Sequence, residues 1–314
     1  MIVCRSLEQW PHRGPVVLTL GTFDGLHLGH RKILDRVRSI SVESGLPSVL
    51  LTFDPHPREV IGRRGDPTYL LTTIDERIEQ LAQSGIDTCM VLPFTRDLSM
   101  LDAKDFFDEY IMRTFRVRHL VVGMDHAFGK GRTGTVDELQ RLGMSNGIDV
   151  TPVGELLLEG VKVSSTAVRS ALKEGDVLKA SRLLGRPYML AGIVVRGDGL
   201  GSQLGFPTAN IQVQDTSKML PKGGVYLVDV TLRGETYTGV MNIGLRPTVS
   251  QQVHFSLEVH ILACSGRFYG LQLHVALLDR LRDEIRFDTR EQLVAQIAED
   301  IERAVIRRNQ LNTK

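Results

Sequence analysis

The first half of the chain alternates short apolar runs with segments whose apolar residues recur every three or four positions. The short runs predict buried strands, and the longer spacing predicts helices that bury one face. The expected strands are residues 16–20, 48–53, 88–94, 119–124 and 150–153, and the expected helices are 29–44, 75–84, 103–116, 135–146 and 166–184. Because strands and helices alternate, we expect an α/β fold with a parallel sheet covered on both faces.

The pattern changes after Gly185 and Pro187, a glycine–proline pair typical of a helix end. From there apolar and polar residues alternate in short runs between glycine turns, at 189–196, 225–232, 237–243, 254–262 and 272–281. This alternation predicts an antiparallel barrel or a sandwich. An apolar stripe from Leu293 to Val305 predicts a closing helix from about residue 290. We therefore expect two domains, 1–186 and 187–314.

Composition is that of an ordinary globular protein, with 314 residues, 24% charged and 42% hydrophobic. No apolar run reaches the length of about 18 residues that a membrane span needs. The N-terminal residues lack the basic and apolar regions of a secretory signal, and the three cysteines lack zinc-site spacing. We therefore expect a cytoplasmic protein without a membrane partner.

Charge argues against nucleic acid as a partner. Residues 1–186 carry 24 basic and 24 acidic side chains, and residues 187–314 carry 14 and 13. Neither half has the basic excess of a nucleic-acid-binding surface. Small anionic ligands remain compatible with this balance.

The first candidate site is the stretch 21–30, Gly-Thr-Phe-Asp-Gly-Leu-His-Leu-Gly-His, which follows the first expected strand and enters the first helix. A glycine-rich turn at a helix N-terminus presents backbone N–H groups and the positive end of the helix dipole to a phosphate. His27 and His30 are three residues apart, so both fall on one face of the first helical turn. The pattern predicts a nucleotide site; the alternative is that the histidines only cap or pack the helix.

The second candidate site is the glycine-rich segment 197–210, which contains Gly201 and Gly205 and ends in Thr208 and Asn210. Its glycines suit a loop that closes over phosphates. Thr208 and Asn210 offer oxygen ligands two residues apart, and Mg²⁺ prefers such oxygens together with nucleotide phosphates. A long hairpin with a tight turn is the alternative.

The 21–30 stretch resembles the His-x-Gly-His signature of the nucleotidyltransferase superfamily. The longer string resembles the bacterial bifunctional riboflavin kinase/FAD synthetases. Residues 52–57, 123–129 and 164–169 resemble further motifs of that family in the same order, and Gly-Phe-Pro-Thr-Ala-Asn at 205–210 resembles its riboflavin kinase motif. The resemblance covers nearly the whole chain. It implies a Rossmann-like nucleotidyltransferase domain followed by a small antiparallel β-barrel with a C-terminal helix.

The resemblance implies that the first domain transfers AMP from ATP to FMN, which gives FAD and pyrophosphate. His27 and His30 would then bind the triphosphate and stabilise the departing pyrophosphate. The residues implied to bind ATP with them are Gly21, Phe23, Asp24, Gly29, Ser164, Ser165, Thr166 and Arg169. Asp125 and Phe128 would line the flavin or nucleotide pocket. From the residues alone, Ser164–Thr166 fit helix capping equally well, and Asp125 fits a loop cap.

The resemblance implies that the second domain phosphorylates riboflavin with ATP and Mg²⁺. Glu258 would be the base, and the alternation of 254–262 places its side chain on the face away from the core. A solvated surface carboxylate is the alternative. Arg282 matches a flavin-binding segment, or it forms a surface ion pair. The chain departs from the family at Ser202, where arginine is usual, and at 263–265, where an acidic residue is usual.

Three functions are compatible with these observations. The leading one is a bifunctional enzyme that converts riboflavin to FMN and then to FAD. The second is an FMN adenylyltransferase whose barrel only binds flavin or regulates. The third is a sensor that binds nucleotide or flavin without releasing pyrophosphate. The sequence leaves open whether the protein is a monomer or a homo-oligomer.

Overall fold

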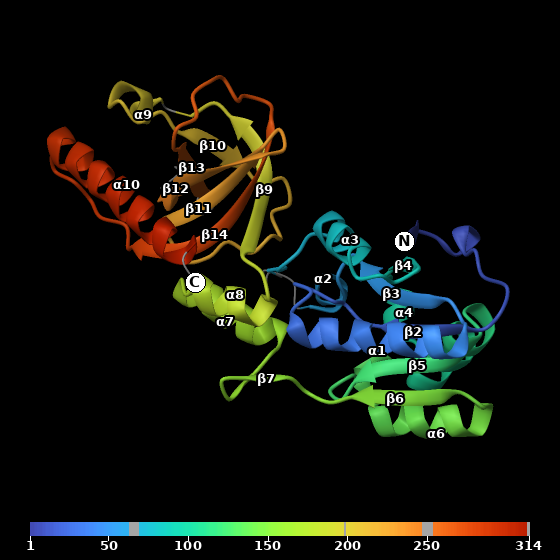
Figure 1. The fold of residues 1–314 in the computed structure, drawn as a ribbon. Coiled ribbons are helices and arrows are strands. Elements are labelled where there is room, and N and C mark those ends of the chain that lie inside the picture. Colours follow the sequence, from blue (N-terminus) through green and yellow to red (C-terminus); the bar gives the residue numbers. More distant parts are fainter. Residues whose placement is uncertain (63–68, 198, 247–253, 313–314) are drawn as a thin grey trace. The chain divides into compact units, whose positions relative to one another are not determined.

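The computed structural model describes residues 1–62, 69–197, 199–246 and 254–312. The chain folds into two compact units, Met1–Ser165 and Thr166–Lys314 (Figure 1). We call them unit 1 and unit 2.

Unit 1 is built on a six-stranded parallel sheet in the order β1-β4-β3-β2-β5-β6. Its strands are β1 (Ile2–Cys4), β2 (Val16–Leu20), β3 (Ser48–Asp54), β4 (Thr88–Pro93), β5 (Val117–Gly123) and β6 (Asp149–Val153). The chain runs from β2 outward through β3 and β4, and then returns to β5 on the other side of β2. The strand order therefore reverses at β2, and parallel sheets bind ligands beyond the carboxyl ends of strands at such a point.

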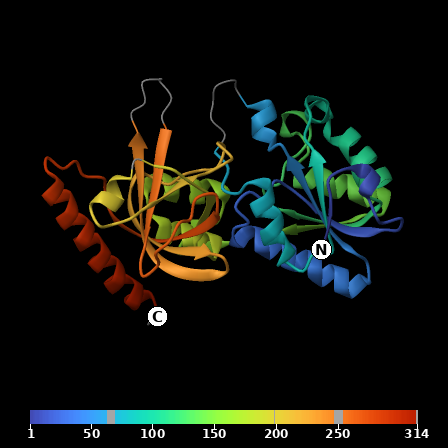
Figure 2. The same ribbon diagram turned by 90° about the horizontal axis from the view of Figure 1, so that it is seen from above.

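Helices cover both faces of this sheet (Figures 1 and 2). The expected helices 29–44, 75–84 and 135–146 are confirmed as α1 (Leu28–Ser44), α3 (Ile74–Ala82) and α6 (Val136–Asn146). The expected helix 103–116 begins as α5 (Ala103–Phe106) and continues as a π-helix, η2 (Phe107–Thr114). The shorter elements are η1 (Leu7–Gln9), α2 (Pro57–Ile61), α4 (Arg96–Met100), η3 (Lys130–Arg132), β7 (Leu157–Leu158) and β8 (Val161–Lys162).

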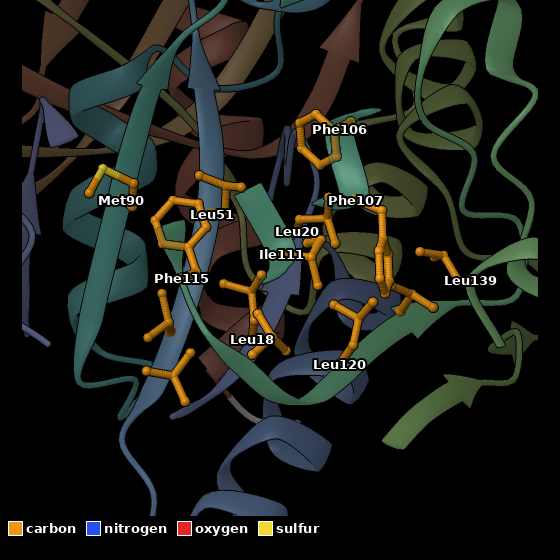
Figure 3. Packing of buried hydrophobic residues seen from close by; sticks show 14 of the residues in the cluster. Leu18, Leu20, Leu51, Met90, Phe106, Phe107, Ile111, Phe115, Leu120 and Leu139 are labelled. Carbon is orange, nitrogen blue, oxygen red and sulfur yellow. The ribbon is translucent and has the colours of Figure 1, made fainter. Parts of the chain in front are cut away.

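The core of unit 1 has two layers, one on each face of the sheet. Leu18 and Leu20 of β2 pack with the phenylalanines of α5 and η2, as Figure 3 shows. Val17 packs on the opposite face with Leu34 and Val37 of α1. Since both faces of β2 are buried, its sequence is a continuous apolar run rather than an alternating one.

Unit 2 contains a closed barrel with the strand order β10-β13-β12-β11-β14-β9, and every pairing is antiparallel. Its strands are β9 (Tyr188–Val195), β10 (Ala209–Gln212), β11 (Gly224–Leu232), β12 (Glu235–Arg246), β13 (His254–Ile261) and β14 (Gln272–Arg282). The structure thus selects the barrel over the sandwich. Strand β10, which begins at the end of the second candidate site, was not expected. The closing helix is α10 (Arg290–Asn312), which lies along the barrel and contacts β11, β12 and β14 (Figure 2).

The expected single helix 166–184 is wrong in one respect. It is two helices, α7 (Ser165–Glu174) and α8 (Val177–Leu184). Gly175 between them has a φ of 80°, and Asp176 caps α8 by accepting a hydrogen bond from Lys179 N (2.8 Å). A left-handed glycine followed by an N-cap ends one helix and starts another.

The two expected fold classes are confirmed. Helix α8 contacts β9 and β14 of the barrel and belongs to unit 2, although it precedes residue 186. The functional boundary near residue 186 stays a prediction. Within the described part of the chain, the structure contains no helix that meets the length and hydropathy needed to cross a membrane.

Candidate active sites

The 21–30 turn joins the end of β2 to the start of α1, at the point where the strand order reverses. Phe23, Gly25 and Leu26 have positive φ angles of 47°, 82° and 41°. This backbone region is strained for residues other than glycine. A Cβ atom on Gly25 would lie 2.6 Å from Leu71 Cδ1, so a side chain does not fit there. The turn therefore follows a strained course that surrounding contacts must hold.

His27 and His30 lie against each other at the start of α1. Their rings are stacked, with centroids 3.6 Å apart and an interplanar angle of 15°. His27 is the N-cap of α1, since its Nδ1 accepts a hydrogen bond from His30 N (3.2 Å). The neutral His27 ring therefore carries its proton on Nε2, as a donor. The expected alternative, that a histidine caps the helix, is therefore confirmed for His27. The same hydrogen bond fixes the tautomer and the orientation of the His27 ring.

His30 is held in its neutral form. Burial, the neighbouring His27 and the positive charge of Arg77, in that order, hold the pKa of His30 well below its usual value. Its Nδ1 atom is buried, and no described residue hydrogen-bonds it. A Cβ atom on Gly29 would meet the His27 ring at 3.1 Å and Val163 O at 3.3 Å, so the glycine allows the close approach of this turn. A buried ring nitrogen without a protein partner is suited to a polar ligand.

Asp24 and Phe23, both expected in the ATP site, are residues of the turn whose side chains are buried. The Asp24 carboxylate accepts hydrogen bonds from Leu71 N (3.0 Å), Thr72 N (2.9 Å) and Thr72 Oγ1 (3.2 Å). The Phe23 ring lies 5.0 Å from the His30 ring, and it would contact a Cβ atom placed on Gly21. Both side chains support the turn from within, and their direct contact with ATP stays a prediction.

The motif at 164–169 spans the division between the two units. Ser165 belongs to unit 1, and its hydroxyl donates to Asp24 O (2.9 Å), so the structure brings it to the turn. Thr166 and Arg169 belong to unit 2. Their contribution to the triphosphate site, like that of Ser164, stays a prediction.

Asp125 and Phe128 follow the carboxyl end of β5, the strand beside β2. Asp125 is exposed and ion-paired with Lys162 of β8. The Phe128 ring packs between those of Phe106 (5.5 Å) and His126 (5.9 Å). Both residues therefore lie at the edge of the sheet where a ligand is expected, and their contact with flavin or nucleotide stays a prediction.

In unit 2 the structure brings together Thr208, Asn210 and Glu258. Asn210 of β10 is the register partner of Glu258 of β13. The Glu258 carboxylate accepts hydrogen bonds from Ser256 Oγ (2.9 Å) and, more weakly, from Thr208 Oγ1 (3.4 Å). Hydroxyl, amide and carboxylate oxygens form a donor set that suits Mg²⁺. The donors fit the expected metal, although the described residues hold no cluster of three His, Cys, Asp or Glu side chains.

The loop before β10 packs closely on these residues. A Cβ atom on Gly201 would meet Phe206 O at 2.5 Å and Thr208 Oγ1 at 3.1 Å. Gly205 has a φ of 88°, and the preceding α9 (Leu200–Gln203) forms one short turn of helix. The glycine-rich segment connects the antiparallel pair β9 and β10, as the hairpin alternative predicts, and its part beside Thr208 is a loop with one helical turn.

Two polar residues beside Glu258 were missed by sequence analysis. Asn242 of β12 is its register partner on the side opposite Asn210, and Ser256 donates to its carboxylate. The alternation of residues 237–243 contains the signal for Asn242. The sequence did not show that Asn242 and Glu258 lie side by side, because only the folded barrel decides which strand pairs with β13.

Arg282, a candidate flavin-binding residue, forms a forked ion pair with Asp300 of α10. Its Nε and Nη2 atoms donate to the two carboxylate oxygens at 2.8 Å and 2.7 Å. The side chains are 14% and 3% exposed. This geometry supports a role in attaching α10 to the barrel, and flavin binding by Arg282 stays a prediction.

Comparisons with known proteins match the two ends of the chain to different families. A family model described as FAD synthetase matches residues 10–167, and one described as riboflavin kinase matches residues 184–306. Three relatives carry the name bifunctional riboflavin kinase/FMN adenylyltransferase. They come from Pseudomonas fluorescens (41% identical, 92% of each chain), Escherichia coli K12 (40%, 94% of this chain and 93% of the relative) and Bacillus subtilis (37%, 92% and 91%).

A solved structure from Streptococcus pneumoniae also resembles the chain over most of its length. The TM-score is 0.87 at 30% identity, over 96% of this chain and 97% of the other. That protein is described as a macrolide-efflux protein. The family models that match this chain describe two flavin-nucleotide enzymes instead.

Proposed function

The chain belongs to the family of bifunctional riboflavin kinase/FMN adenylyltransferases, and from this premise we propose which residues carry each reaction. The protein phosphorylates riboflavin to FMN and adenylylates FMN to FAD, with ATP as the second substrate of both steps. We assign the adenylyl transfer to residues 1–186 and the kinase to residues 187–314. The matches at 10–167 and 184–306 support this division.

In the adenylyltransferase site, a phosphate oxygen of FMN attacks the α-phosphorus of ATP. A new P–O bond forms, the bond to the bridging oxygen breaks, and the electron pair leaves with pyrophosphate. The reaction needs positioning and charge stabilisation rather than a covalent intermediate. His27 Nε2–H and the His30 ring bind the triphosphate at the positive end of α1, and Ser165, whose hydroxyl donates to Asp24 O, holds the phosphates with them. The roles of Ser164, Thr166 and Arg169 on the phosphates are those that the family resemblance implies. The stacked histidine pair, held by its own cap hydrogen bond, is the observation that carries this assignment.

In the kinase site, Glu258 takes the proton from the 5′-hydroxyl of riboflavin as that oxygen attacks the γ-phosphorus of ATP, and ADP leaves. Ser256 and Thr208 hold the Glu258 carboxylate in place. Thr208 and Asn210 are the proposed ligands of Mg²⁺, which neutralises charge on the nucleotide phosphates when bound. The neighbouring Gly201 and Gly205 let the loop backbone approach ATP.

A time course tests the two steps together. Purified protein is incubated with riboflavin, ATP and Mg²⁺, and FMN and FAD are followed separately. We expect FMN to accumulate first and FAD to follow. FAD from supplied FMN without any FMN from riboflavin would reduce the function to adenylyl transfer, and binding without pyrophosphate release would leave only a sensor. We place these reactions in the cytoplasm, because the scattered cysteines, two of them buried, fit a reducing compartment.

A further inference from the structure

Arg77 of α3 is a charged side chain buried inside unit 1, and the mechanism above does not use it. It is 1% exposed, and it is the largest fully buried side chain of the described residues. Burying a guanidinium is costly unless its charge and donors are satisfied. Its Nε–H has no hydrogen-bond partner among the described residues. Since burying this charge costs stability, Arg77 is expected to have a role other than filling space.

The donors of Arg77 connect two segments that lie apart in sequence. Its Nη1 donates to Thr52 Oγ1 (3.2 Å) and, at a longer distance, to Phe53 O (3.4 Å), both in β3. Its Nη2 donates to Thr72 O (3.4 Å), just before α3. Thr52 and Thr72 are themselves buried. Arg77 thus joins the carboxyl-end half of β3 to the segment that leads into its own helix.

Each of these segments in turn contacts the 21–30 turn. Thr52 Oγ1 donates to Thr22 O (3.2 Å). Thr72 Oγ1 accepts from Gly25 N (3.0 Å), and Thr72 N donates to Asp24 (2.9 Å). The two contacts fall on either side of Phe23, whose φ of 47° makes it one of the strained residues of the turn. A closed network of hydrogen bonds therefore runs from Thr22 through Thr52, Arg77 and Thr72 back to Asp24 and Gly25.

We propose that Arg77, Thr52 and Thr72 are positioning residues of the adenylyltransferase site, which hold the strained turn and so place His27 and His30 against the triphosphate. The proposal rests on the function assigned to the two histidines. The three residues touch no substrate in this scheme. Their effect passes through Thr22, Asp24 and Gly25, which precede His27 by two to five residues in the same tight turn.

The charge of Arg77 also affects the proposed adenylyltransferase site. It contributes to the lowered pKa of His30, after burial and His27. The negative charges of Asp24, Asp54 and Glu59 offset part of the cost of burying Arg77 itself. A cation behind the turn also favours the binding of a polyanion in front of it.

The test compares Thr72→Val with Thr72→Ser. Valine keeps the shape of threonine and removes the hydroxyl that holds Gly25, whereas serine keeps the hydroxyl. Displacement of catalytic groups by about 1 Å costs roughly 100-fold in rate. We therefore expect Thr72→Val to lower kcat of FMN adenylylation by about 10- to 100-fold, and Thr72→Ser to stay within about 3-fold of the parent.

Thr19→Val is the matched control. Thr19 is a buried threonine of β2, the strand that leads into the same turn, and no described residue hydrogen-bonds its hydroxyl. Its loss should leave kcat unchanged. The intact full-length protein supplies two further readouts: the riboflavin kinase activity of the barrel, and the fluorescence of Trp10, the only tryptophan, which reports the folding of unit 1.

Equal kcat values in Thr72→Val and Thr19→Val, with native Trp10 fluorescence in both, would overturn the proposal. If Thr72→Val does not fold, Thr52→Val against Thr52→Ser makes the same comparison from the other end of the network. Arg77→Lys should also lower kcat of FMN adenylylation, because one ammonium cannot replace the guanidinium fork that joins Thr52 to Thr72. Full adenylylation activity in that variant would contradict the proposal. Loss of activity in His30→Ala together with full activity in Thr72→Val would refute only the positioning role, whereas full activity in His30→Ala would refute the assigned site itself.

Discussion

The two proposed active sites of this protein are built in opposite ways. The proposed adenylyltransferase site centres on ten consecutive residues, which a buried polar network holds in a strained conformation. The proposed kinase site is assembled from separate strands: Thr208 and Asn210 come from β10 and its approach, and Glu258 from β13, whose neighbour β12 adds Asn242. A contiguous site is visible in the sequence as one dense motif. A site made by strand register is visible only as fragments.

The difference also concerns how each site withstands substitution. Changes beneath the 21–30 turn are expected to act through backbone geometry, since the turn is strained and supported from behind. Changes in the barrel are expected to act locally, because the barrel strands that bear the site are regular, paired on both sides and closed into a ring. Having both activities in one chain makes each site the internal control of the other.

The largest expected effect is that of Glu258→Gln on the kinase. A positioned general base typically contributes about 10²- to 10⁴-fold, so FMN formation from riboflavin should fall by that factor. FAD formation from supplied FMN should be unchanged. Glu235→Gln, an exposed carboxylate of the same barrel, is the control. Normal kinase turnover in Glu258→Gln would remove this carboxylate from the mechanism.

The corresponding change in unit 1 is His30→Ala. Loss of one group that stabilises transition-state charge typically costs about 10²- to 10³-fold, so FAD formation should fall by at least about 100-fold while FMN formation continues. His119→Ala, on β5 and paired with Asp149, is the matched control. FAD synthesis within a few-fold of the parent would show that the 21–30 turn does not carry the reaction.

A substitution of Asp300 tests whether Arg282 stabilises the barrel or binds flavin. Asp300→Ala leaves the Arg282 charge buried without its forked partner, which typically costs about 3–5 kcal/mol of stability. The kinase should therefore lose activity at a lower temperature, while the thermal transition reported by Trp10 in unit 1 stays in place. Glu299→Ala, exposed on the adjacent position of α10, is the control. A raised KM for riboflavin at a temperature where the barrel is folded would instead favour the flavin-binding role of Arg282.

The smallest expected effect is the acid sensitivity of unit 1. Burial first, and then the charge of Arg132, lower the pKa of His126 to about 4. The unfolded chain takes up a proton near pH 6.5 and the folded chain does not, so stability falls as the pH drops from about 6.5 to 4. The loss at pH 5 is about 2 kcal/mol by this linkage. Thermal melts followed by Trp10 fluorescence should show a smaller drop between pH 7 and pH 5 in His126→Phe, which keeps a ring beside Phe128. An unchanged drop would show that His126 does not cause the sensitivity.

Much of the fold follows from local sequence. The apolar runs at 16–20 and 88–94 predict strands that the structure contains, because burial of a strand is decided within a few residues. The helix expected at 75–84 is likewise present, and Thr73 and Glu76 form a capping box at its start. Strand β10 was not predicted. Its four residues form a strand only because β9 and β13 lie on both sides of it.

Long helices show the same limit. The stripe expected in α10 includes Val305, which is 45% exposed, whereas its neighbour Ala304 is fully buried. Periodicity identifies the helix, but its rotation against the barrel depends on which side chains the barrel surface accepts.

The sequence by itself determined the two-part organisation, the parallel and antiparallel classes, and the glycine-rich histidine turn at the start of a helix. These properties depend on spacing along a few consecutive residues. Only the tertiary structure decided between barrel and sandwich, placed Ser256 and Asn242 beside Glu258, turned Asp24 inward, and joined Thr52, Thr72 and Arg77 beneath the turn. Each of these depends on contacts between segments separated by many residues, which spacing along a few consecutive residues does not specify.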